Sequence, residues 1–159
     1  MPDLEDIART AAATRTEIHA GHASCRPMSE NHDAVGMAGE LAFGKAVGLM
    51  PDFEPRIGGD NGIDFILPLV LTVDVKTFRR PGNLIHEVGK PFADLFVLAG
   101  YRDEDGSAEL IGWATGSDLR KAPTRDFGHE VISHYIPAKD LRPMSQLLGK
   151  MLLTRGKAP

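Results

Sequence analysis

Residues 58–78, with the sequence GGDNGIDFILPLVLTVDVKTF, decide how this chain folds. The run LTVDVKTF at the end of this stretch is rich in β-branched residues, which is typical of a strand. Strand side chains point to alternate faces, so Asp74 and Lys76 are predicted to share a face, roughly 6–7 Å apart along the strand. The glycine-rich GGDNG segment leads into a second acid, Asp64.

The spacing of the two acids predicts a hairpin that brings them together. Asp64 and Asp74 are equally distant from Leu69. An antiparallel hairpin with an odd-numbered loop, residues 68–70 or 67–71, places their Cα atoms ~4.5–5.5 Å apart. Two like charges ~5 Å apart repel by about 3 kcal/mol at an effective dielectric constant of ~20.

A chain that keeps two carboxylates at such positions, beside a lysine, is predicted to bind a divalent cation between them. Hard cations such as Mg²⁺ take oxygen ligands, including one or two carboxylates. The alternative interpretation is a solvated ion pair of Asp74 with Lys76 on the polar face of an edge strand.

This pattern resembles the PD-(D/E)XK nuclease superfamily, whose members have the restriction-endonuclease-like fold. Its signature is an Asp at the start of a hairpin and, further along, Asp or Glu, any residue, and Lys. The matching residues here are Asp64, Asp74 and Lys76, within GIDF and VDVK. Ile63 stands where the name-giving proline would be, and members often lack that proline. Many members add a helical Glu upstream, for which GMAGELAFGKAVG offers Glu40. The resemblance covers about residues 31–137.

The resemblance implies a metal-dependent DNA nuclease that hydrolyses phosphodiester bonds. Asp64 and Asp74 would hold one or two Mg²⁺ (or Mn²⁺) ions, helped by the Val75 carbonyl and by Glu40, directly or through water. The metal would activate a water molecule and stabilise charge on the phosphate. Lys76 would orient or deprotonate that water, or neutralise the developing charge. Members without cleavage activity exist, so the second hypothesis is a nucleic-acid-binding or assembly module of the same fold.

Composition and charge set limits on the partners and the cellular location. The 159 residues, 42% apolar and 25% charged, predict a single globular domain. A net charge of −4 argues mildly against general affinity for nucleic acid. A basic cluster follows the motif, however, and Arg79, Arg80 and Lys90 are candidate phosphate contacts that would give affinity rather than specificity. Cys25 has no partner for a disulfide, which suits a reducing cytoplasm. No apolar run reaches the ~18 residues of a membrane helix, so no membrane contact is expected.

The predicted fold is α/β, a restriction-endonuclease-like mixed β-sheet of about five strands flanked by helices. It divides into a helical N-terminal part at 3–48, a catalytic core at 49–137 and a C-terminal helix at 140–153. The helical part holds one helix at about 3–23 and a second that ends near residue 47. In the core, the buried run 94–101 and the stretches 109–115 and 131–136 are predicted strands, the last one at a sheet edge, and 79–91 is predicted to be a loop or short helix. The apolar hairpin tip, residues 68–70, is expected to pack on a neighbouring subunit, as in a homodimer, or on the first helix.

Overall fold

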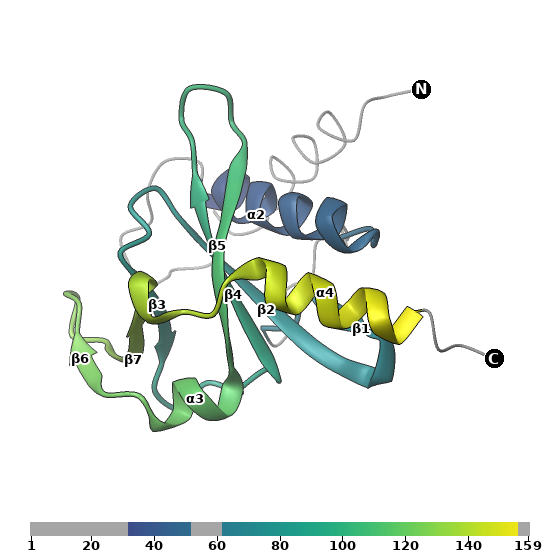
Figure 1. Ribbon diagram of the computed structural model, residues 1–159. Coiled ribbons are helices and arrows are strands. Elements are labelled where there is room, and N and C mark those ends of the chain that lie inside the picture. The colour runs from purple at the N-terminus through teal and green to yellow at the C-terminus, as the bar shows by residue number, and fades with distance from the viewer. Residues whose placement is uncertain (1–31, 52–61, 156–159) are drawn as a thin grey trace.

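The computed structural model describes residues 32–51 and 62–155 (Figure 1). The predicted helix at 3–23 lies outside these ranges. Along the described chain, the elements are α2 (His32–Val47), β1 (Phe65–Leu67), β2 (Leu71–Phe78), β3 (Asn83–Glu87), β4 (Leu95–Tyr101), β5 (Ala108–Thr115), α3 (Gly116–Lys121), β6 (Thr124–Asp126), β7 (Ile132–Pro137) and α4 (Met144–Arg155). Short 3₁₀ turns occupy Pro68–Val70 and Ala138–Asp140. No helix in these ranges is long and apolar enough to cross a membrane.

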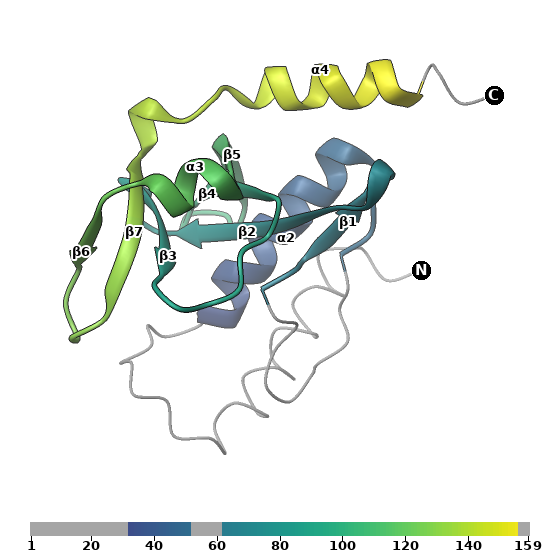
Figure 2. The ribbon, with the colours of Figure 1, turned by 90° about the horizontal axis from the view of Figure 1, so that it is seen from below.

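The strands form two sheets, so the fold is α/β as predicted, but the single sheet of about five strands is wrong. A four-stranded mixed sheet has the order β1-β2-β4-β5, in which β2 and β4 are parallel and the outer pairs are antiparallel. A separate antiparallel sheet has the order β3-β7-β6. Figures 1 and 2 place this second sheet at one end of the molecule, while the β1–β2 turn and the end of α4 lie at the other.

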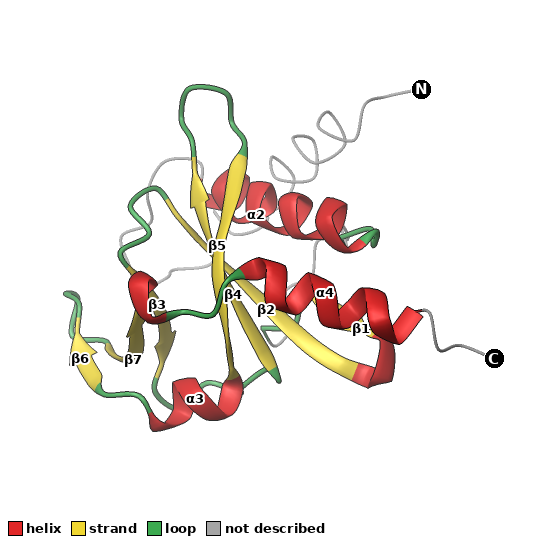
Figure 3. Cartoon of the chain, viewed as in Figure 1, coloured by secondary structure: helices red, strands yellow, loops and turns green. Residues whose placement is uncertain are grey.

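The second sheet contains the main error of the sequence prediction. Strand β3 lies within the segment 79–91, which was expected to be a loop or short helix. The breakers Pro81, Gly82 and Gly89 flank this strand instead of interrupting it, and its alternate residues Leu84 and His86 are buried. Strand β7 agrees with the strand predicted at 131–136, but it is the central strand of its sheet and not an edge. Figure 3 shows the strands of this small sheet to one side of the larger sheet.

The β1–β2 hairpin has the predicted register and the shorter of the two predicted loops. Its pairs run from Phe65 opposite Val73 to Leu67 opposite Leu71, around the turn Pro68–Val70. Leu69 and Val70 at the tip adopt φ angles of 69° and 61° and are 78% and 77% exposed. A left-handed conformation is costly for a side chain with a Cβ, and most of all for a β-branched one. The tip therefore combines backbone strain with exposed apolar surface.

Each face of the mixed sheet carries its own apolar core. The central strand β4 is buried on both faces, as its continuous apolar run predicted. One core joins side chains of α2 and α4 to the face that bears Val73, Val75 and Val97. The other core joins Phe96 and Leu98 to side chains of α3 and of the second sheet. Since strand side chains alternate, Asp74 and Lys76 belong to the face of this second core.

Helix α2 ends at Val47, where its end was predicted, and lies tightly on strand β2. A Cβ atom at Gly39 would stand 1.9 Å from the Thr77 Oγ1 atom, so only glycine allows this approach. Its buried side chains include Phe43 and Val47, whereas Lys45 and Ala46 are exposed.

The C-terminal helix starts at Met144, four residues later than the predicted boundary at 140. Proline disfavours the helical conformation of the residue before it and is well suited to the first helical position. Pro143 therefore delays the helix. Arg142 instead forms an isolated antiparallel bridge with Trp113, exchanging two backbone hydrogen bonds of 3.0 Å. Trp113 is 5% exposed and donates from Nε1 to the Pro143 carbonyl at 3.2 Å.

Candidate functional site

Asp74 and Lys76 lie together on one face of β2, as predicted. The Lys76 Nζ atom is 2.7 Å from Asp74 Oδ2, and the two side chains are 30% and 3% exposed. The solvated pair of the alternative interpretation is wrong for Asp74, because the carboxylate is buried. Burying a carboxylate costs several kcal/mol unless partners compensate it, so this is an unusual position for an acid.

Gly62, shortly before β1, lies directly beside this buried carboxylate. Gly62 has a φ angle of 74°, and a Cβ atom there would stand 3.3 Å from Asp74 Oδ2. A larger residue would be strained by its backbone conformation and would crowd the carboxylate. The last glycine of GGDNG thus shapes the surroundings of Asp74.

Asp64 lies next to the same strand segment, but not in a regular pair with Asp74. The regular pairing of β1 with β2 ends at Phe65, which lies opposite Val73. Continued by one residue, it would place Asp64 opposite Asp74. Instead, the Asp64 backbone N–H donates to the Val73 carbonyl at 2.8 Å. The Asp64 side chain turns to β2, where its Oδ2 accepts a hydrogen bond of 2.6 Å from the Val75 backbone N–H. The Asp64 carboxylate is therefore bound to the backbone of the residue that follows Asp74, and the two acids do not form a regular cross-strand pair.

Glu40 is buried, with 7% exposure, but it reaches the sheet from the other side. Its helix packs through Phe43 and Val47 on the face of Val73 and Val75, whereas Asp74 belongs to the opposite face. Within residues 32–51 and 62–155, no group of three or more His, Cys, Asp or Glu side chains is arranged to hold a metal ion. The structure thus brings Asp64 and Asp74 to one strand segment without adding Glu40 as a third ligand.

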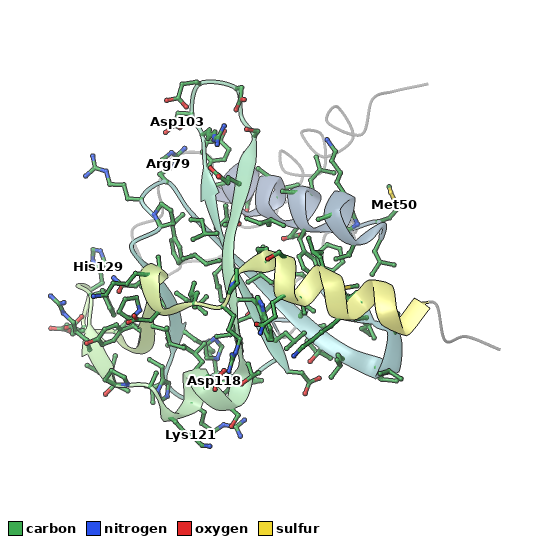
Figure 4. All side chains as sticks on the ribbon, viewed as in Figure 1. Met50, Arg79, Asp103, Asp118, Lys121 and His129 are labelled. Carbon is green, nitrogen blue, oxygen red and sulfur yellow. The ribbon has the colours of Figure 1, made fainter. Side chains whose placement is uncertain are left out.

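The candidate phosphate contacts differ in their surroundings. Arg79 pairs with Asp103, with 3.0 Å between Nε and Oδ1, and its guanidinium lies 5.4 Å from the centre of the Tyr101 ring. Figure 4 shows Arg79 and Asp103 beside the turn between β4 and β5. Arg80 and Lys90 are exposed at the two ends of the segment that contains β3. Arg79 would therefore have to share its charge with Asp103, while the other two side chains face solvent.

Sequence reasoning did not place one further polar residue, His86, at this site. Its side chain is buried, with 5% of the residue exposed, and its ring centre lies 4.5 Å from that of Phe92 and 4.9 Å from that of Phe96. Burial and the nearby charge of Lys76 lower the pKa of His86, against smaller opposing effects of its bond to the Lys90 carbonyl and of Asp74. The alternation of NLIHE, which puts Leu84 and His86 on one face, is the signal that could have found it.

In comparisons with known proteins, no family model, curated protein or solved structure matches the chain.

Proposed function

We propose that this chain is a metal-dependent DNA nuclease that hydrolyses phosphodiester bonds. The observation that carries the proposal is the buried Asp74, held by Lys76 and accompanied by Asp64 on the same strand segment. Asp74 is 2% exposed, and removing a carboxylate from water costs free energy that other interactions must offset. An ion pair on the surface would not carry this desolvation cost. The restriction-endonuclease-like identity of the fold is part of this proposal.

The donor atoms at the site suit Mg²⁺ or Mn²⁺. Mg²⁺ is commonly held by one or two carboxylates, with water and substrate phosphates completing the shell, so a third protein ligand is not required. Asp64 and Asp74 would supply these carboxylates, helped by the Val75 carbonyl, whereas Glu40 lies on a helix at the opposite face of the sheet. When bound, the ion supplies Lewis-acid stabilisation of phosphate charge and a more acidic water molecule.

Lys76 would supply positive charge where negative charge develops. Its ammonium group has three N–H donors and is 30% exposed, so it can contact a phosphate while its stem stays on the sheet. In the absence of substrate it neutralises Asp74 at 2.7 Å. It would therefore orient the attacking water or neutralise the pentavalent phosphate in the transition state.

The bound nucleic acid would be held by sequence-independent contacts. Arg80 and Lys90 are exposed, and Arg79 is tied to Asp103 in the free protein. Lysine and arginine contacts to phosphates give affinity that falls with salt and carry no base information.

The test is cleavage of plasmid and of single-stranded DNA by purified protein in Mg²⁺ or Mn²⁺, with EDTA as the comparison. We expect cleavage only with the metal. A Lys76→Ala preparation, purified in parallel, controls for contaminating nucleases, because it should leave both substrates intact. Equal cleavage by the two preparations, or none by the wild type with either metal, would contradict the proposal.

A second candidate is an assembly module on the same fold that does not cleave, and the hairpin tip favours it. Leu69 and Val70 are strained and exposed, and Ile66 of β1 is 62% exposed, a combination that suits contact with a second subunit. Analytical ultracentrifugation distinguishes this function. A homodimer that Leu69→Asn dissociates, in a protein without cleavage activity, would favour the assembly module.

A further inference from the structure

We propose that His86 is the general base of this site, and that its Nδ1 atom takes the proton that water loses on attacking the phosphodiester. The inference rests on the proposed nuclease function and reassigns one role within it. Lys76 then acts only as a cation, and the lone pair that accepts the proton comes from the second sheet.

Packing on Phe96 places His86 on the face of the sheet that bears Asp74 and Lys76. In the parallel pairing of β2 with β4, Asp74 stands opposite Phe96, so the two side chains share one face of the sheet. The His86 ring packs on Phe96 with 4.9 Å between ring centres, and His86 is buried. His86 thus occupies the face of the sheet that bears the buried acid.

The hydrogen bonding of the ring determines which nitrogen carries the proton. His86 Nε2 lies 3.4 Å from the Lys90 carbonyl oxygen. A carbonyl oxygen only accepts hydrogen bonds, so this contact is a hydrogen bond in the tautomer that carries its hydrogen on Nε2, which the proposal adopts. In the neutral imidazole, Nδ1 then holds the lone pair and is the atom able to accept a proton.

The other polar groups of the site are less suited to this role. Lys76 is engaged by Asp74 as an ammonium, which has three donors and no lone pair. Asp64 already accepts the Val75 amide hydrogen. Burial and the charge of Lys76 lower the pKa of His86, so its base form predominates at neutral pH.

The charges around the ring come from three elements. Strand β2 provides Asp74 and Lys76, which act on the imidazolium in opposite directions. Strand β7 provides His134, the register partner of His86, whose Nδ1 lies 3.2 Å from the Ala122 carbonyl. Helix α3 provides Arg120, whose guanidinium lies 4.7 Å from the ring centre of Phe92, between the two histidines. Of the charged groups, Lys76 opposes protonation of His86 and Asp74 favours it, as do the backbone carbonyls of Lys90 and Pro91.

The proposed step is balanced with water as the only co-reactant. The water oxygen forms a bond to phosphorus as one of its O–H bonds breaks, and the proton goes to His86 Nδ1. The bond from phosphorus to the leaving sugar oxygen breaks with its electron pair, and that oxygen takes a proton from solvent water. The imidazolium then returns its proton to the resulting hydroxide, which restores the neutral ring.

The pH dependence of DNA cleavage tests this role, with His134→Asn as the matched control for His86→Asn. The wild-type rate should fall as the pH drops through a value below 6.5, because the ring is then protonated. His86→Asn should lower the rate by about 10²–10⁴-fold and abolish that acidic limb, whereas His134→Asn should keep both. Added imidazole should restore activity to His86→Ala. An acidic limb that persists in His86→Asn would overturn the assignment while leaving the nuclease intact, whereas a wild type that cleaves nothing would overturn both.

A second measurement does not depend on activity or on the folding of a His86 variant. Nitrogen NMR of the metal-free wild type should show the His86 hydrogen on Nε2 and a pKa below 6.5. Lys76→Met removes the neighbouring positive charge and should raise that pKa. A hydrogen on Nδ1, or a His86 pKa that Lys76→Met leaves unchanged, would refute the proposal.

Discussion

Replacing Asp74 with asparagine tests whether this acid is held in the fold at a cost in stability. The change removes one negative charge and keeps the shape of the side chain. Asp74 is 2% exposed and lies near two charged groups, Lys76 at 2.7 Å and Asp64, whose carboxylate binds the next backbone amide. The outcome depends on which of these interactions is larger.

Two effects favour the variant and one opposes it. Loss of the repulsion from the Asp64 carboxylate, which accepts the backbone N–H of the residue after Asp74, favours the variant. The neutral amide also avoids part of the desolvation cost of a buried carboxylate. Against this, the ion pair is lost, but Lys76 is 30% exposed and can turn to water, so the loss is nearer the ~1 kcal/mol of an exposed pair. We expect Asp74→Asn to be more stable by about 1–2 kcal/mol in EDTA, which raises the Tm by about 2–8 °C.

The same variant should lose the response to metal. An ion that binds only the folded protein stabilises it by ~2.7 kcal/mol at a hundredfold excess over its Kd. The wild type should therefore melt several degrees higher in Mg²⁺ or Mn²⁺, and Asp74→Asn should gain little. Thermal denaturation followed by circular dichroism measures both, with Asp103→Asn as control, since Asp103 pairs with Arg79 away from the site. If Asp74→Asn melts lower than the wild type in EDTA and still responds fully to Mn²⁺, Asp74 is an ordinary ion-pair partner.

Three further predictions concern other side chains. Lys76→Ala should abolish cleavage and keep the affinity for Mn²⁺ measured by calorimetry; wild-type turnover would remove Lys76 from the chemistry. Arg79→Ala with Arg80→Ala should weaken binding of unrelated DNA sequences alike and flatten the salt dependence by about 1 to 2 units, and an unchanged slope would move the interface elsewhere. The hydrogen bond from Arg142 lowers the pKa of Asp118 to about 2, so the stability that this pair provides is present above pH 3.8 and is lost as the pH falls towards 2. Asp118→Asn should remove that loss from a series of Tm values against pH, and an identical acid profile would show that the pair contributes nothing.

The parts of the fold that were predictable from sequence depend on local patterns. The register of the β1–β2 hairpin followed from the odd-numbered turn centred on Leu69, and the buried strand β4 followed from an unbroken apolar run. The cap of α3 is a local feature as well, because the Thr115 side chain accepts the Asp118 backbone N–H at 3.0 Å within a capping box.

The parts that were missed depend on contacts between distant segments. Strand β3 pairs with β7, about fifty residues later in the chain, so no local pattern distinguished it from a loop among prolines and glycines. The hydrogen-bond partner of the Asp64 side chain could not be predicted either, because the carboxylate binds the Val75 backbone N–H instead of facing Asp74 across the strands. His86 reaches the site only through this second sheet and its packing on Phe96.

The most direct test of the central claim is plasmid cleavage in water enriched in ¹⁸O, with Mg²⁺, by the wild type and by Asp64→Asn and Asp74→Asn. Hydrolysis at this site predicts that wild-type products carry one ¹⁸O atom per new terminal phosphate, and that both variants leave the plasmid intact. Products without the label, or cleavage by either variant at the wild-type rate, would contradict the claim that these two carboxylates support phosphodiester hydrolysis.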